Sequence, residues 1–100
     1  MALRRLRRTS RVNEDLAAAL EYYRARNPAA AVKFLNEFQR MCRLIAQFPE
    51  WFPVQSRSVR PELLVVRRAV MRRFDFLIYC AFDDHFVTVL RLVHGAREEL

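Results

Sequence analysis

The sequence has little glycine and no apolar run long enough to cross a membrane. Gly95 is its one glycine, and three of its four prolines fall between residues 49 and 61. No apolar stretch approaches the roughly 20 residues that a membrane-spanning helix needs. The N-terminal MALRRLRR lacks the apolar segment of a secretory signal peptide. These absences predict a cytoplasmic protein.

Cysteine and lysine are scarce as well. Cys42 and Cys80 lie inside apolar patterns, without CxxC spacing or a histidine at ligand spacing. We interpret both as buried thiols in a reducing compartment. Lys33 is the one lysine beside 17 arginines.

The residues that are abundant predict a folded, basic domain. Hydrophobic residues make up 53% of the chain and aromatic residues 12%, which is too much for a disordered protein. One hundred residues allow a single domain, residues 1–100, without a second core.

The net charge of +7 comes from 18 basic and 11 acidic residues. Arginine pairs bidentately with phosphate or carboxylate, so its excess indicates a nucleic acid or an acidic protein as partner. A genome rich in arginine codons is an alternative that explains the number of arginines better than their clustering.

Two helices are predicted in the first half of the chain. Thr9 and Ser10 offer N-cap hydroxyls, Glu14 and Asp15 place negative charge in a first turn, and apolar residues repeat at helical spacing over residues 11 to 26. Asn27 and Pro28 then end this helix and begin a second one. The second helix carries the apolar stripe Ala31, Phe34, Leu35, Phe38, Met41, Cys42, Ile45 and Phe48. The short link predicts an antiparallel hairpin.

Strands are predicted in the second half. Residues 49 to 61 form an irregular loop that Trp51 and Phe52 pin down, although a surface anchor for a partner is the alternative. Strands follow near residues 64 to 70, 73 to 82 and 85 to 93, with a hairpin turn at Asp83-Asp84. The middle strand has one apolar face, expected against the helices, and one mixed face. The basic N-terminal stretch can be a further strand anchored by Leu3 and Leu6, or a basic arm.

Four segments in this order resemble the RelE/ParE toxin superfamily: EYYRARNPAAAVKFLNEF, FPEWFPV, VRRAVMRRFDFLIYCAFDD and VLRLVHGARE. The resemblance implies an α+β fold with an N-terminal strand, an antiparallel helix hairpin and then a three-stranded antiparallel meander. The ending from Leu90 to Glu98 is similar to the ParE-like branch, often labelled plasmid stabilisation proteins. Glu98 replaces the usual aspartate, and the loop before Pro53 lacks the glycine turns of many relatives.

The resemblance implies the toxin of a type II toxin-antitoxin system. ParE-like toxins are associated with poisoning DNA gyrase by binding it, and a cognate antitoxin wraps and neutralises them. No cofactor, metal or small-molecule substrate is implied. For this chain we expect an acidic, amphipathic antitoxin helix as partner. A remnant that has lost toxicity and only binds the antitoxin is a further alternative.

RelE-like relatives instead cut messenger RNA on the ribosome without a metal. The matching candidates here are Arg73, Tyr79, Arg91, His94 and Arg97. The tail tyrosine of many such ribonucleases is missing, so the sequence leaves open whether the chain is an enzyme and favours a binding protein. His94 can equally be a strand-exit residue, and Tyr79 a packed aromatic.

Six arginines on or beside the predicted sheet are expected to contact the target or the antitoxin: Arg67, Arg68, Arg72, Arg73, Arg91 and Arg97. Arg91 interrupts an apolar strand, so it needs a partner or ligand, and Asp75 is one candidate for a structural ion pair.

Overall fold

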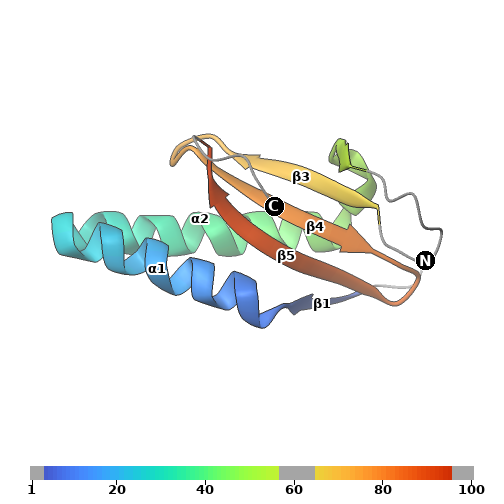
Figure 1. Ribbon diagram of the computed structural model, residues 1–100, viewed down its shortest axis with the longest axis horizontal. Helices are drawn as coiled ribbons and strands as arrows, with labels where there is room; N and C mark the ends of the chain where they lie inside the picture. Colours follow the sequence, from blue (N-terminus) through green and yellow to red (C-terminus); the bar gives the residue numbers. More distant parts are fainter. Residues whose placement is uncertain (1–3, 57–64, 96–100) are drawn as a thin grey trace.

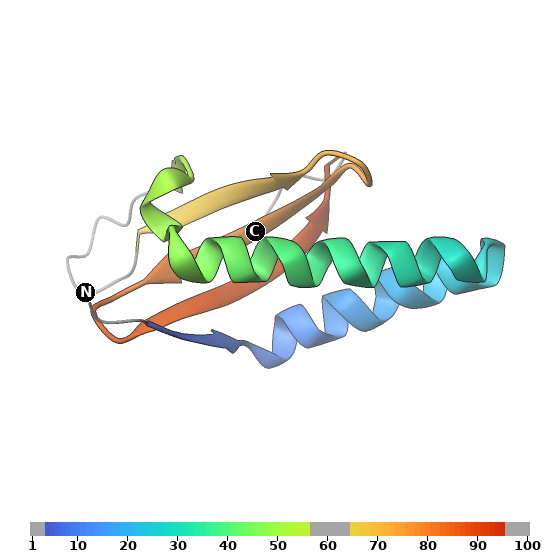
Figure 2. The same cartoon turned by 180° about the vertical axis from the view of Figure 1, so that it is seen from behind.

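The computed structural model describes residues 4–56 and 65–95. The elements in chain order are β1 (Arg5–Arg8), α1 (Ser10–Arg26), α2 (Pro28–Gln47), the short 3-10 helix η1 (Pro49–Trp51), β2 (Val54–Ser56), β3 (Val66–Met71), β4 (Phe76–Phe82) and β5 (Phe86–His94). Both helices lie on the same side of the sheet, and the tip of their hairpin projects past its end (Figure 1 and Figure 2). The α+β class expected from the sequence is confirmed.

The sheet has five strands in the order β1-β5-β4-β3-β2. The expected antiparallel meander is present as β3, β4 and β5. A simple meander is nevertheless wrong for the whole sheet, because β1 pairs in parallel with β5 at one edge and β2 pairs with β3 at the other. Pro53 does not prevent the last pairing, since its carbonyl accepts a bond from Arg68 N at 3.0 Å.

Local side-chain caps explain where the helices begin. Thr9 Oγ1 accepts a hydrogen bond from Val12 N at 3.0 Å, and Asn27 Oδ1 accepts one from Ala29 N at 3.1 Å. The first helix begins at Ser10, so Asp15 lies beyond its first turn. The predicted role of that carboxylate at the helix terminus is therefore wrong, and its actual partners lie on the sheet.

The main core lies between the helices and one face of the sheet. The stripe of α2 and the facing strand residues are buried together: Phe34, Phe38, Met41, Cys42, Ile45, Ala69, Met71, Ile78, Cys80, Val87, Val89 and Leu92. Burial of this apolar surface is the chief stabilising term in such a fold. Tyr23, Phe34, Phe74 and Phe76 add ring contacts with centroids 5.0–6.5 Å apart.

Several local expectations need correction. Leu6 is 39% exposed and does not anchor β1, while Leu3 lies outside the described residues. Trp51 is 66% exposed and stacks on Phe48 with ring centroids 3.9 Å apart. Of the two aromatic residues, Phe52 is the one that holds the segment after α2 against the core. In the described part of the chain, no helix is long and apolar enough to cross a membrane.

Strand β4 starts at Phe76 rather than at residue 73. The preceding residues make a turn in which Asp75 has a positive φ of 56°, a conformation that does not continue a strand. The hairpin turn expected at Asp83-Asp84 is confirmed: Asp83 Oδ1 accepts bonds from His85 N and Phe86 N, each at 2.8 Å.

Candidate functional site

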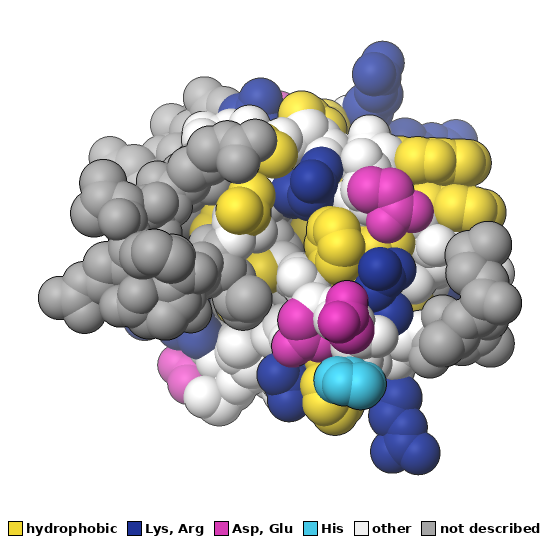
Figure 3. Space-filling model, turned by 90° about the vertical axis from the view of Figure 1, so that its right-hand side faces the viewer, with side chains coloured by type: hydrophobic (Ala, Val, Ile, Leu, Met, Phe, Trp, Pro, Cys, Tyr) yellow, Lys and Arg dark blue, Asp and Glu magenta, His cyan; other side chains and the backbone are white. Residues whose placement is uncertain are grey.

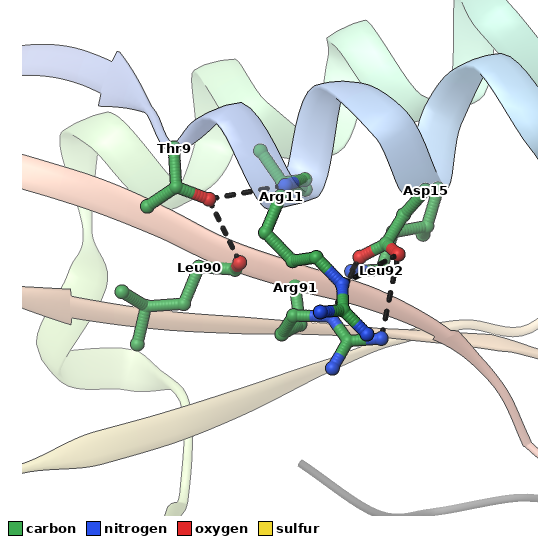
Figure 4. Close-up of polar contacts among 7 residues, drawn as sticks. Thr9, Arg11, Asp15, Leu90, Arg91 and Leu92 are labelled. Carbon is green, nitrogen blue, oxygen red and sulfur yellow. Dashed lines mark hydrogen bonds and ion pairs between the residues drawn. The ribbon is translucent and has the colours of Figure 1, made fainter.

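Arg91, the charged residue within β5, has its partner on α1. Asp15 accepts hydrogen bonds from Arg91 Nε at 2.8 Å and from Arg91 Nη2 at 3.3 Å. The same carboxylate accepts a bond from Leu92 N at 2.9 Å (Figure 4). The side chains are 13% (Asp15) and 23% (Arg91) exposed. The expected ion pair therefore exists, but with Asp15 and not with Asp75.

Beyond the end of β1, the edge of β5 is covered by the start of α1, and the contact with Asp15 is one of the hydrogen bonds that join them. Thr9 N donates to Val89 O at 3.2 Å, and Thr9 Oγ1 donates to Leu90 O at 2.9 Å. Asp15 then accepts from Leu92 N, one turn and a half further along α1. Backbone groups that an edge strand would leave open are thus satisfied by the start of α1. Asp15 and Thr9 are structural residues of the β5 edge.

Tyr79 lies at the centre of the sheet, on the face away from the helices. It is paired across the strands with Arg68 on β3 and Arg91 on β5, so the fold brings these three candidates into one row. Tyr79 is 0% exposed and belongs to a small buried cluster with Leu77 and Val93. A phenol in this position cannot reach an RNA phosphate without a change in structure.

His94 occupies the last position of β5, beside the turn that precedes β4. Its Nε2 lies 4.0 Å from Asp75 Oδ2, its side chain is 47% exposed, and its ring meets Phe76 edge-on at 5.2 Å. Gly95 N donates to Asp75 O at 2.7 Å. A Cβ at Gly95 would lie 2.6 Å from Asp75 Oδ1 and 3.1 Å from Asp75 O, so a larger residue here would require Asp75 to move.

The remaining predicted arginines point to different parts of the surface. Arg67 Nη1 donates to Phe52 O at 2.8 Å and to Glu50 O at 3.3 Å, so it ties β3 to the segment after α2. Arg72 and Arg73 are exposed in the turn before β4. Arg97 lies outside the described residues. Within the described chain, the predicted arginines therefore do not form one continuous patch.

The two cysteine thiols are buried and are not activated as nucleophiles. Burial raises the pKa of the Cys42 thiol and of the Cys80 thiol to about 11, so neither is a thiolate near neutral pH. Among residues 4–56 and 65–95, no three His, Cys, Asp or Glu side chains come together in a way that could hold a metal ion.

The sequence analysis did not predict the arginines of β1 as a candidate binding surface. Strand β1, with Arg4 before it, presents four arginines around Leu6, and every residue of the strand is exposed. Two of these guanidinium groups lie over aromatic rings of the sheet: Arg4 Cζ is 4.7 Å from the centroid of Phe82, and Arg7 Cζ is 4.0 Å from that of Phe86. The only sequence signal was the RRLRR stretch itself.

Basic charge does not extend evenly over the end of the molecule where β1 begins. In the view of Figure 3, basic, acidic and hydrophobic side chains are interleaved on that end. Acidic groups near it include Glu50, 3.8 Å from Arg4 Nη1. The pKa of Asp83 is lowered by its hydrogen bonds from Phe86 N and His85 N, and the nearby charges of His85 and Arg7 add to this effect. The concentrated positive charge therefore belongs to the strand rather than to this whole end.

Comparisons with known proteins agree with the architecture. Residues 6–99 match the family model described as "ParE toxin of type II toxin-antitoxin system, parDE". Among solved structures, the chain is similar to one titled "Chromosomal ParDE TA system from P. aeruginosa", with a TM-score of 0.73 and 19% sequence identity, covering 92% of this chain and 96% of that chain. At that identity the structural likeness concerns the fold. A comparison with curated protein sequences gives no match.

Proposed function

The chain belongs to the ParE toxin family of type II toxin-antitoxin systems, and we propose that it inhibits growth by binding a target such as DNA gyrase. The observation that carries this proposal is that two of the candidate catalytic side chains pack or form an ion pair within the protein itself. Tyr79 is fully buried, and Arg91 is held by Asp15. A protein that acts only by binding needs no general acid or base, so the burial of Tyr79 and the pairing of Arg91 are compatible with that function.

Cleavage of RNA makes a stricter demand on geometry. A general base must come within hydrogen-bond reach of the 2′-hydroxyl, and cations must reach the phosphate. Of the described candidates, Arg73 and His94 have substantial exposure, and they lie in the turn before β4 and at the end of β5. The other two described candidates, Tyr79 and Arg91, are respectively buried and paired with Asp15, which supports the binding interpretation over the catalytic one.

Purified protein and purified gyrase provide the direct test. We expect the protein to reduce DNA supercoiling or to accumulate gyrase-dependent DNA breaks, in proportion to its concentration. An inert basic protein of similar charge serves as the control for nonspecific DNA binding. Growth arrest in cells, with supercoiling and DNA breakage untouched, would refute gyrase as the target.

A ribosome-dependent ribonuclease is the second candidate, and the position of His94 favours it. The imidazole is 47% exposed, and its Nε2 lies 4.0 Å from Asp75 Oδ2, so a ligand can reach it. Primer extension on translating ribosomes would then show codon-specific cuts, and His94→Gln would abolish them. Equal growth arrest by wild type and His94→Gln, without cuts, would remove this candidate.

We also propose a cognate acidic antitoxin, because the net charge of +7 favours association with an acidic protein. Arg68, Arg72 and Arg73, and Arg97 beyond the described residues, remain proposed contacts for the antitoxin or the target. Co-purification with the product of the adjacent reading frame tests the partnership. Induced expression that leaves growth unaffected, while this complex forms, would instead identify a non-toxic remnant that only binds the antitoxin.

A further inference from the structure

We infer that the outer edge of β1 accepts an extended acidic segment of the antitoxin as a sixth strand of the sheet. The inference rests on the proposed function only for the identity of the partner. Strand β1 stands at the end of the strand order, and all four of its residues are exposed. The described part of the chain contains no element that pairs with its outer side.

The register of β1 shows which backbone groups face outward. Arg5 N donates to His85 O at 2.9 Å, and Thr9 N donates to Val89 O at 3.2 Å. Arg5 and Arg7 pair with Phe86 and Thr88 in a parallel ladder, so the backbone groups of residues 5, 7 and 9 face β5. The N–H and C=O groups of the alternate residues, Leu6 and Arg8, therefore point away from the sheet and are open to a new strand.

The side chains of this strand favour an acidic occupant. No carboxylate in the described chain lies within ion-pair distance of Arg5, Arg7 or Arg8. Arg7 is already held in place, because its Nε donates to Thr88 Oγ1 at 3.0 Å and its guanidinium lies over Phe86. Its remaining N–H groups are left to bind an anion, at a reduced entropic cost of ordering.

The same charges disfavour a second copy of the chain at this edge. Two β1 strands paired edge to edge would place the arginines of one copy against those of the other, and like charges on neighbouring strands repel. A charged edge strand is a usual defence against self-association. An acidic strand would meet no such repulsion, and its carboxylates would be attracted to the arginines of β1.

The geometry further specifies the sequence of the occupant. Arg5 and Arg7 lie on one face of the strand, about 7 Å apart. The half-exposed Leu6 lies on the other face, with Arg8, whose Cζ is 6.0 Å from the Phe38 ring centroid. The matching segment therefore has two acidic residues separated by one apolar residue, so that the carboxylates meet Arg5 and Arg7 and the apolar side chain meets Leu6.

Hydrogen exchange on the full toxin, alone and with the co-expressed antitoxin, tests this strand addition. In the free chain the amides of Leu6 and Arg8 should exchange quickly, while those of Arg5 and Arg7 are protected by β5. In the complex, Leu6 and Arg8 should gain protection of at least about tenfold. An intact complex in which both amides still exchange quickly would overturn the inference and would favour an antitoxin helix bound elsewhere.

A proline substitution provides an independent test with a matched control. Leu6→Pro removes an outward N–H, a loss that an edge strand tolerates, together with the leucine side chain, and it should weaken antitoxin binding at least about tenfold. Leu6→Ala also loses the leucine side chain but keeps the N–H, so it should weaken binding clearly less than Leu6→Pro, and the difference between the two variants reports the lost hydrogen bond. Equal affinities of a folded Leu6→Pro and wild type would overturn the strand addition. If wild type itself bound no product of the adjacent frame, the proposed antitoxin partnership would fail, and the inference with it.

Discussion

Removing the Asp15 carboxylate should destabilise the fold more than the loss of any other ion pair among residues 4–56 and 65–95. In Asp15→Ala, Arg91 loses both of its described hydrogen bonds to a carboxylate, and Leu92 N loses its acceptor. Breaking a buried pair by removing one partner costs about 3–5 kcal/mol. Because both side chains keep some contact with water, we expect about 2–3 kcal/mol here.

This loss corresponds to a fall of roughly 10–20 °C in melting temperature for a domain of this size. Thermal and urea unfolding followed by circular dichroism would measure it. Asp15→Asn retains an oxygen that can accept from Leu92 N, so it should cost about half as much. A double-mutant cycle of Asp15→Ala with Arg91→Ala should give a coupling energy of about 1–3 kcal/mol.

The ion pair between Glu37 and Arg40 supplies the matched control. It has the same shortest distance, 2.8 Å, but it joins residues three apart on one helix, and its arginine is 56% exposed although Glu37 is 16% exposed. Its hydrogen bonds lower the pKa of Glu37, and the charges of Arg40 and Arg73 add to this effect. Glu37→Gln should leave the melting temperature unchanged within error. If Asp15→Ala behaved like Glu37→Gln, then Asp15 would not seal the β5 edge, and the account of Arg91 as a structural residue would be wrong.

Three further predictions test other parts of the fold. Burial raises the pKa of the Cys42 and Cys80 thiols to about 11, against 9.0 for an exposed thiol. The free energy of unfolding should therefore be unaffected by these groups below pH 9 and should fall as pH rises from about 9 to about 11, less steeply in a Cys42→Ala/Cys80→Ala variant. Gly95→Ala should lower the melting temperature because its Cβ would crowd Asp75, and adding Asp75→Gly should restore part of the loss. Trp51 should emit as an exposed indole that acrylamide quenches readily, and an unquenched tryptophan would contradict the position of η1.

The parts of the fold that depend on neighbours in the sequence could be predicted from it. Asn27 and Pro28 end one helix and start the next through local hydrogen bonding and a fixed φ, as expected. The turn at Asp83-Asp84 likewise depends on one aspartate and the two amides that follow it. The helical stripe of α2 needed only its own periodicity.

Pairings between distant residues could not be predicted in the same way. A charged residue within an apolar strand indicated that Arg91 needs a partner, but the sequence contains several acidic residues that could fill this role. Asp15 is the partner because α1 packs along β5. The sequence predicted that one face of β4 is mixed, because charged and apolar residue types occur together on it. Leu77, Tyr79 and Ala81 on that face are buried, and side chains of the neighbouring strands pack against the first two: Val66, Leu90 and Val93.

The distribution of positive charge links the sequence to the proposed partner. Arg91 and Arg67 are bound within the fold by a carboxylate and by backbone carbonyls, so part of their hydrogen-bonding capacity is already used there. The arginines of β1 have no such carboxylate within the described chain and retain their charge at an open edge. Charge of this kind raises the rate of association and is screened by salt, whereas edge hydrogen bonds slow dissociation. An antitoxin bound at β1 should therefore associate more slowly at high salt, while Leu6→Pro should act mainly on its dissociation.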